Sequence, residues 1–265
     1  MARAAWRLLL DPPRPAGFNM AVDEALLECA PSGPPTLRLY AWEKPSVSLG
    51  YRQSAPDWLR RCASAGVEAV RRVSGGGTVV HAGDLTYAIS ASACSGALPA
   101  DLGGSYAWIR DALLDGLLSA GLRADRSPGR PGAELEDLCF ASSTGYELEL
   151  EGRKLVGSAQ RRTAWGLLQH GSIRLSDDAW VYRDVLGLPA PPPPRLPELD
   201  RTRLAAAFTA SFARAAGAPL RPGRLSAGEL RAVRGRLSAR QADPLAVAPL
   251  VPDRRSGAAG ALAQH

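Results

Sequence analysis

Hydrophobic positions recur along the first two thirds of the chain with two different periods, and together they predict a mixed helix and strand architecture. Apolar residues at helical spacing indicate helices over residues 18–29 and 104–120, with a shorter helix over 56–65. The helix over 18–29 is expected to be amphipathic. Alternating or continuous runs of β-forming residues predict strands over 6–10, 36–42, 47–49, 67–73, 85–92, 146–151, 154–156 and 167–173. The short connections favour an α+β fold with a mixed, largely antiparallel sheet and helices packed on it.

The pattern changes after residue 187. A proline-rich run over 190–197 is typical of an extended connector, and helical patterns return over 199–216 and 226–240. The last fifteen or so residues are rich in Ala, Gly and Pro, and we expect them to be disordered. The sequence therefore predicts a main domain over 1–187, a connector over 188–198 and a small helical extension over 199–265.

Composition narrows the possible partners only partly. The chain has 265 residues, is 46% hydrophobic and carries a net charge of +6, so it can bury a full core and has a basic surface. That charge fits an acidic partner such as nucleic acid, an acidic carrier protein or an anionic cofactor. Because arginine replaces lysine almost throughout, a generally basic solvated surface explains it equally well. Nucleic-acid binding is disfavoured, since no aromatic interleaving or recognisable motif accompanies the charge.

The cysteines, histidines and apolar runs limit which cellular compartment and which metal sites we expect. The four cysteines (Cys29, Cys62, Cys94 and Cys139) are far apart and show no metal-ligand spacing, and only three histidines are present. We therefore expect no zinc site. The N-terminal apolar run is too short for a signal-peptide core, and nothing approaches a membrane span. A cytoplasmic protein with free thiols is the prediction, in which Cys29, Cys62 and Cys94 are packing residues.

A glycine-rich segment over residues 71–81 reads RRVSGGGTVVH. Three consecutive glycines let a backbone approach a ligand closely and direct N–H groups at an anion or a carbonyl oxygen. The segment matches neither the dinucleotide nor the P-loop pattern. A tight hairpin remains the alternative, although two preceding arginines and a following histidine favour a binding loop.

Residues 139–173 carry the candidate chemistry, with a cysteine, a lysine-bearing turn and a small-residue step. Cys139 offers the most nucleophilic side chain in its thiolate form, and a nearby ammonium favours that thiolate. Lys154 is one of only two lysines, and lysine can release its proton where arginine cannot. We predict a Cys139–Lys154 acyl-transfer pair; the alternative for Cys139 is a small buried packing residue.

Four motifs in order resemble the lipoate–protein ligase and octanoyltransferase family, which shares its fold with biotin protein ligases. The motifs are NMAVDEAL (19–26), LRLYAWEKPSVSLGYRQ (37–53), RRVSGGGTVVHAGDLTY (71–87) and GRKLVGSAQRRTAWGLLQHGSI (152–173). Within the family, Cys139-Phe140 followed by a strand and the lysine motif most resembles the cysteine-dependent octanoyltransferases. The chain departs from the family pattern at Ala82, where members commonly carry aspartate, and at Ser74, where threonine is frequent.

The resemblance implies a catalytic domain over 1–187 and a role for each matching residue. Cys139 would hold the octanoyl group as a thioester, and Lys154 would hold the thiolate and later accept a proton from the target lysine. Backbone N–H groups of the loop glycines or of Gly157 would stabilise the oxyanion. Arg71 and Arg72 would bind the acidic carrier or its phosphopantetheine phosphate. The expected substrate-binding residues are Arg71, Arg72, Ser74, Gly75, Gly76, Gly77, His81, Gly157, Ser158, Ala159 and His170.

The implied reaction moves an octanoyl or lipoyl group from acyl carrier protein to a lipoyl domain, of the glycine cleavage H protein or of a 2-oxoacid dehydrogenase E2, without a cofactor. Three alternatives stay open. An ATP-dependent lipoate or octanoate ligase would use ATP and Mg²⁺ and make Cys139 incidental. An amidotransferase would move the acyl group between lipoyl domains. A silent member would only bind acylated carriers, although retention of both Cys139 and Lys154 disfavours that.

Overall fold

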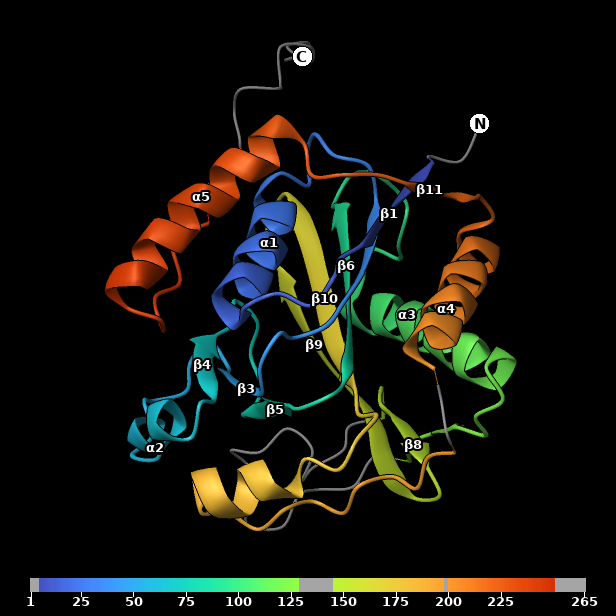
Figure 1. The fold of residues 1–265 in the computed structure, drawn as a ribbon. Coiled ribbons are helices and arrows are strands. Elements are labelled where there is room, and N and C mark those ends of the chain that lie inside the picture. The colour runs from blue at the N-terminus through green and yellow to red at the C-terminus, as the bar shows by residue number, and fades with distance from the viewer. Residues whose placement is uncertain (1–4, 129–144, 198–199, 251–265) are drawn as a thin grey trace.

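The computed structural model describes residues 5–128, 145–197 and 200–250. Within them, a mixed main sheet runs through the centre of the molecule in the order β11–β1–β2–β6–β10–β9–β8–β7 (Figure 1). β1 pairs in parallel with β2 and β11, and the other neighbours are antiparallel. The strands are β1 (Trp6–Leu10), β2 (Thr36–Tyr40), β6 (Leu85–Ser92), β7 (Asp125–Arg126), β8 (Leu148–Leu150), β9 (Arg153–Arg162), β10 (Gly166–Ile173) and β11 (Leu220–Pro222).

A smaller sheet stands apart from the main one. Its centre is β3 (Ser46–Leu49), which pairs in parallel with β4 (Glu68–Arg71) and antiparallel with β5 (Val79–His81). An apolar cluster joins this sheet to α2 (Leu59–Ser64) and to a short π-helix, Val181–Leu186. The segment between β4 and β5 is the glycine-rich loop, so the small sheet holds that loop at both ends.

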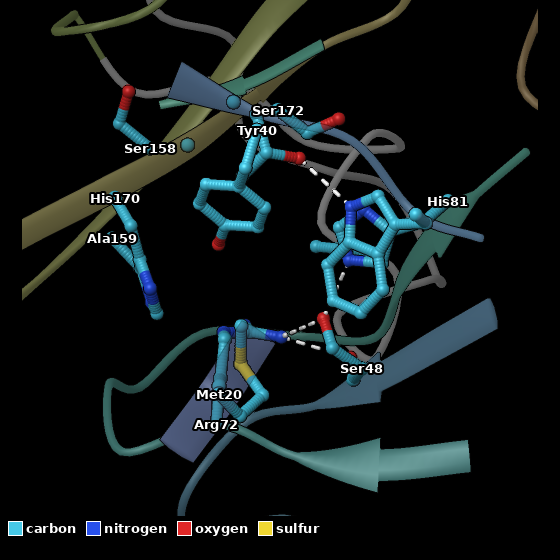
Figure 2. A pocket seen from close by; sticks show the side chains of 14 residues that line it. Met20, Tyr40, Ser48, Arg72, His81, Ser158, Ala159, His170 and Ser172 are labelled. Atoms are coloured by element: carbon cyan, nitrogen blue, oxygen red, sulfur yellow. Dashed lines mark hydrogen bonds between the residues drawn. The ribbon is translucent and has the colours of Figure 1, made fainter. Parts of the chain in front are cut away.

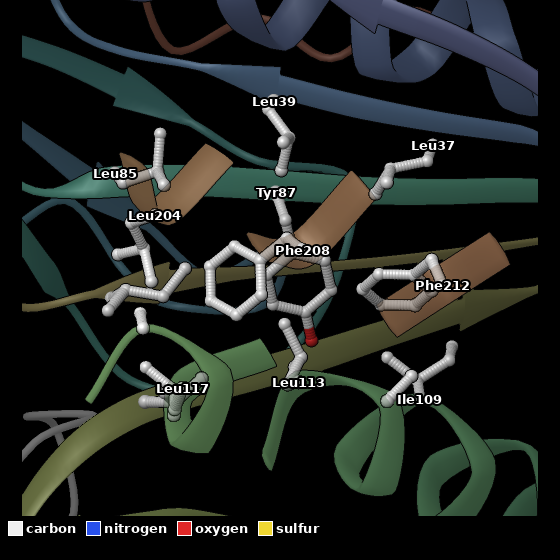
Figure 3. Packing of buried hydrophobic residues seen from close by; sticks show 14 of the residues in the cluster. Leu37, Leu39, Leu85, Tyr87, Ile109, Leu113, Leu117, Leu204, Phe208 and Phe212 are labelled. Carbon is white, nitrogen blue, oxygen red and sulfur yellow. The ribbon is translucent and has the colours of Figure 1, made fainter. Parts of the chain in front are cut away.

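Alternation along β6 gives the main sheet two different faces. Leu85, Tyr87 and Ile89 belong to the large core cluster beneath α3 (Leu102–Ser119) and α4 (Arg201–Ala216) (Figure 3). Ala88 instead packs with residues of α1 (Ala16–Glu28) on the opposite face. Side chains alternate across a strand, so one strand contributes to both layers.

Close packing of α3 on α4 depends on Gly116. A Cβ there would lie 2.4 Å from Cδ1 of Phe208, a distance that no real side chain tolerates. The helices therefore approach closely enough to bury Phe208 and Phe212 between them and the sheet (Figure 3).

The helix expected over 18–29 forms over Ala16–Glu28, but it is not amphipathic. Asn19, Asp23 and Glu24 are fully buried. Asn19 and Asp23 accept hydrogen bonds from Arg38 of β2, whereas Glu24 lies under α5 (Ala227–Ala242), which packs on the other side of α1 (Figure 1). Arg240 on α5 donates to Glu24 at 2.6 Å. The sequence prediction was wrong here because the partners of these polar residues lie on β2 and on a helix about two hundred residues away, and the pattern within residues 18–29 does not reveal that they pack there.

The other predicted helices and strands are found, most with bounds shifted by a few residues. The strand predicted over 154–156 runs instead from Arg153 to Arg162. The Glu151-Gly152 turn joins β8 and β9, and both residues have positive φ, 52° and 70°. β5, β7 and β11 were not anticipated, and β11 brings a short part of the 199–265 region into the main sheet. Residues 188–197 form no helix or strand, and Arg174 and Arg153 donate to their carbonyls. The expected disordered tail lies mostly outside the described residues.

α5 is anchored to β1 through a buried ion pair. Arg7 donates to both carboxylate oxygens of Glu229, at 2.8 and 2.5 Å, and Glu229 also forms a capping box with Ser226. Burial alone would raise the pKa of Glu229, but hydrogen bonds from Arg7 and from the Ser226 backbone outweigh it and lower the pKa. Ionised Glu229 therefore stabilises the folded state.

We expect Glu229→Gln to lower the free energy of unfolding by about 2–4 kcal/mol at pH 7. The gap between wild type and variant should be complete above the ordinary glutamate pKa, and it should shrink as the pH falls through the lowered one. Urea denaturation at pH 7 and pH 4 measures both. Glu43→Gln, at an exposed glutamate, is the matched control. A gap that stays constant with pH would contradict this assignment.

Candidate functional site

A pocket opens between the α1 face of the main sheet and the small sheet (Figure 2). Its lining combines an apolar side, including Met20 and Trp42, with hydroxyl and imidazole groups. The lining residues are Met20, Tyr40, Trp42, Ser48, Arg72, Val79, His81, Thr86, Gly157, Ser158, Ala159, His170, Gly171 and Ser172. They come from α1, both sheets and the start of the glycine loop, so the pocket forms only when these layers assemble.

The floor of the pocket consists of small residues on neighbouring strands. Gly157 of β9 lies opposite Ser172 of β10, and Ala159 lies opposite His170. Because alternate residues of a strand share a face, Gly157 and Ala159 belong to the same side of β9. Their small size leaves room above the sheet for a ligand.

Gly171 allows close packing on the opposite face of these strands. A Cβ at Gly171 would lie 2.5 Å from the Gly157 carbonyl oxygen and 2.6 Å from Cε1 of Tyr87. Its absence lets the Tyr87 hydroxyl cross beneath β10 and reach Oγ of Ser158 at 2.7 Å. The hydroxyl of Ser158 is therefore engaged on the far side of the sheet, while the residue still contributes to the pocket wall.

His170 connects the main sheet to α1 and to the glycine loop. Its Nδ1 lies 2.8 Å from Oδ2 of Asp23, and its Nε2 lies 2.5 Å from Oγ of Ser74. Arg38 and Tyr40 donate to the same carboxylate at 2.7 and 2.9 Å. All five side chains are buried.

The electrostatics of this cluster keep Asp23 ionised. Burial favours a protonated carboxyl, but the hydrogen bond from His170 and the charge of Arg38 outweigh it, and the pKa of Asp23 falls below its ordinary value. Burial also raises the pKa of Tyr40 far above its ordinary value, so its phenol stays a hydrogen-bond donor. At neutral pH, Asp23 is therefore an ionised acceptor and Tyr40 a neutral donor.

His81 makes a second, similar chain on the small sheet. Its Nε2 lies 2.9 Å from Oγ of Ser48, and its Nδ1 lies 2.8 Å from Oδ2 of Asp84. Trp42 stacks on the imidazole with ring centroids 3.9 Å apart. The Ser172 hydroxyl also donates to Asp84, which ties the small sheet to the pocket floor.

Arg72 braces the glycine loop, and Arg71 braces the segment after β3 that packs against it. Arg72 donates to the carbonyls of Ser48, Gly75 and Gly77, and Arg71 donates to the carbonyls of Gly50 and Gln53. Their guanidinium groups thus hydrogen-bond to loop carbonyls, whereas contact with a carrier phosphate stays a prediction for both.

The loop packs tightly beside the β3 end. A Cβ on Gly50 would lie only 1.9 Å from the Gly76 carbonyl oxygen, so a glycine is required at 50. Gly75 and Gly76 are exposed, and neither they nor Gly77 line the pocket. An oxyanion role for their N–H groups remains a prediction.

Lys154 lies on β9, three residues before Gly157, and is buried. Its ammonium donates to Oε1 of Glu147 at 2.5 Å. The side chain does not line the pocket among the described residues. Cys139 lies outside the described residues, so its pairing with Lys154 stays a prediction.

The other cysteines separate into two environments. Cys29 and Cys62 are buried, as expected of packing residues, and burial raises the pKa of the Cys62 thiol. Cys94 was also expected to pack, but it is exposed because the chain turns into solvent directly after β6.

In the described ranges, no cluster of three or more histidine, cysteine or acidic side chains is placed to hold a metal ion. In the same ranges, no helix is both long and apolar enough to span a membrane.

Sequence reasoning missed several residues of these clusters. Asp23 and Asp84 orient the two pocket histidines, while Ser48 and Trp42 contact His81. The spacing of His81 and Asp84 was a weak available signal. Asp23 and His170 are 147 residues apart, so only the fold brings them together.

Comparison with protein families places residues 15–191 in the lipoyl protein ligase A/B catalytic domain model. The chain is 40% identical over 204 residues to octanoyltransferase LipM of Carboxydothermus hydrogenoformans, a match covering 76% of this chain and 72% of that protein. It is 37% identical over 254 residues to octanoyltransferase LipM of Kyrpidia tusciae, covering 84% and 92% of the two chains.

Solved structures with the same fold are lipoate–protein ligases. A lipoate-protein ligase A bound with ATP matches with a TM-score of 0.72 at 22% identity, over 89% of this chain and 95% of that one. The bipartite lipoate protein ligase of Thermoplasma acidophilum, from a study with its E2 lipoyl domain, matches with a TM-score of 0.69 at 20% identity, over 94% and 100%. The predicted α+β fold with a mixed sheet is confirmed.

Proposed function

Because the chain belongs to the lipoyl protein ligase A/B catalytic-domain family, we propose that it transfers an octanoyl group to the lysine of a lipoyl domain. Relatives that are 37–40% identical over most of their length are octanoyltransferases, which supports this reaction over ligation. The donor we propose is octanoyl-acyl carrier protein. The acceptor is a lipoyl domain of the glycine cleavage H protein or of a 2-oxoacid dehydrogenase E2.

The observation that carries the proposal is a pocket floored by small residues that follow a buried lysine on one strand. Gly157 and Ala159 leave space above the sheet, and Met20, Tyr40, Trp42 and Val79 supply apolar surface for an acyl chain. Burial of each methylene of such a chain contributes about 0.8 kcal/mol. Entry of a carrier-bound octanoyl group into the pocket is therefore favourable.

The first half-reaction exchanges one thioester for another. The Cys139 thiolate attacks the carbonyl carbon of the donor, its sulfur–carbon bond forms, and the carbon–sulfur bond to the carrier breaks. The carrier thiolate leaves as a thiol by taking a proton from the Lys154 ammonium, which leaves Lys154 neutral for the next step. Because reactant and product are both thioesters, the step is nearly isoenergetic and needs no ATP.

The second half-reaction makes the amide. The neutral amine of the acceptor lysine attacks the acyl-enzyme, and Cys139 leaves as the thiolate. Lys154, in its neutral form, takes the proton that the new amide nitrogen loses, and its ammonium then stabilises the thiolate. Glu147, 2.5 Å from the ammonium, holds the lysine in place between turnovers.

Intact-mass spectrometry tests the function directly. The protein is mixed with octanoyl-acyl carrier protein without ATP, and a lipoyl domain is then added. We expect one octanoyl group on the enzyme, labile to hydroxylamine, which passes to the domain. If no adduct forms and the domain is acylated only with free octanoate, ATP and Mg²⁺, the ligase replaces this proposal. An octanoylated lipoyl domain serving as donor to a second domain would assign the amidotransferase.

A further inference from the structure

Arg161 lies at the edge of the pocket floor, on the pocket side of β9. It follows Ala159 by two residues, so the two share a face of the strand and are separated by about 7 Å. Their partners on β10 are Leu168 and His170. Arg161 is thus the next position outward from the small residues that floor the pocket.

The guanidinium of Arg161 packs beside Tyr51 but has no acidic partner among the described residues. Its Nε is buried and has no hydrogen-bond partner, and among the described residues Arg161 forms no ion pair. Its Cζ lies 5.1 Å from the centre of the Tyr51 ring. A buried donor left without an acceptor is unfavourable, so the site gains free energy when an acceptor arrives.

Tyr51 links this cation to the glycine loop. Its backbone N–H donates to the Ser74 carbonyl at 2.8 Å, and its side chain is 42% exposed. The aromatic ring therefore stands at the surface beside the loop and holds the guanidinium from one side.

Neighbouring arginines already have acceptors. Arg71 and Arg72 donate to carbonyls that brace the loop, and Arg162 donates to Oγ of Ser105 and to the Ala100 carbonyl. Of the arginines on β9 and before the loop, Arg161 is the one whose geometry leaves it available for an anion.

We propose that Arg161, supported by Tyr51, is a binding site for the phosphate of the donor's phosphopantetheine arm. This inference rests on the proposed function and reassigns to Arg161 the phosphate contact expected of Arg71 and Arg72. A guanidinium matches phosphate oxygens with paired N–H groups. The acyl group and the thioester are neutral, and the phosphate is the anionic group of the arm. Binding it far from the reacting carbonyl orients the thioester in the pocket.

Two synthetic donors that differ by one group test the site. S-octanoyl-pantetheine and S-octanoyl-4′-phosphopantetheine carry the same acyl chain, and the ratio of their kcat/KM values for acylation of the enzyme reports the phosphate contact. We expect wild type to favour the phosphorylated donor about tenfold. Arg161→Gln should bring the ratio close to one, and Tyr51→Leu should lower it in part. Arg162→Gln, one residue along the strand, should keep the wild-type ratio.

The outcomes separate this site from the proposed reaction. Equal kcat/KM for the two donors in wild type would overturn the phosphate site and leave octanoyl transfer standing. So would a ratio that Arg161→Gln does not change. Acylation by neither these donors nor octanoyl-acyl carrier protein would overturn the reaction and the site with it. A third outcome would also overturn the site: wild type shows no preference between the donors, but ATP inhibits acylation, and Arg161→Gln abolishes that inhibition. The Arg161 guanidinium would then bind a nucleotide phosphate instead.

Discussion

Replacing Cys139 with serine is expected to lower the rate of octanoyl transfer by about 10⁴-fold or more, the scale seen when a covalent nucleophile is removed. A serine hydroxyl is far less acidic than a thiol, so it supplies very little of the anionic nucleophile at neutral pH. Intact-mass spectrometry after mixing with octanoyl-acyl carrier protein should show no hydroxylamine-labile adduct. Any octanoyl group retained by the variant should be a stable ester.

Cys94→Ser is the matched control, because Cys94 is an exposed thiol on the same chain and should acylate only if labelling is non-selective. The control variant should form the thioester at the wild-type rate. An undiminished rate in Cys139→Ser would show that the acyl group does not pass through this cysteine, and would favour an acyl-adenylate route.

The parts of the fold that the sequence predicted are those with a local signature. β6 and β10 were predicted with nearly correct bounds, because each is a run of β-forming residues long enough to cross a buried sheet. The β8–β9 turn also has a local signature, because Gly152 readily adopts the positive φ that such a turn needs. Neither case required knowledge of a distant segment.

The parts that it missed depend on distant pairing. β11 has three residues and exists because Leu220 pairs with Trp6, more than two hundred residues away. α1 was predicted as amphipathic because its polar residues resemble a solvated face. In the fold, Asp23 faces His170, and Glu24 faces Arg240 of α5.

The candidate site divides in the same way. His81 and His170 were expected near a pocket through their motifs, and both lie in its lining. The roles of Arg71 and Arg72 could not be read from charge, because a guanidinium can receive an anion or brace a loop. Only the structure distinguishes these two roles, because it shows that both guanidinium groups donate to backbone carbonyls. Arg161 sits in the GSAQRR step, where sequence gives no reason to separate it from Arg162.

Two substitutions of Lys154 should separate its charge from its proton chemistry. Lys154→Arg keeps a cation beside Glu147 but cannot release a proton near neutral pH. We expect this variant to retain most of the acylation of Cys139 and to lose transfer to the lipoyl domain by about 10²–10⁴-fold. Lys154→Met should lose both half-reactions, because the thiolate then lacks its stabilising charge. Single-turnover mass spectrometry follows each half-reaction on its own.

Folding must be kept apart from chemistry in this test, because Lys154 is 8% exposed and its ammonium pairs with Glu147. Removing the lysine takes its charge away from the buried Glu147 carboxylate, and loss of one member of a buried ion pair destabilises a protein by about 3–5 kcal/mol. Lys154→Met combined with Glu147→Gln removes both charges, so the double variant should recover most of the lost stability and none of the transfer. Lys44→Met, at the other lysine and on the surface, should leave both half-reactions at wild-type rates. If the double variant regained transfer, Lys154 would be a structural partner of Glu147 and the proton would leave by another group.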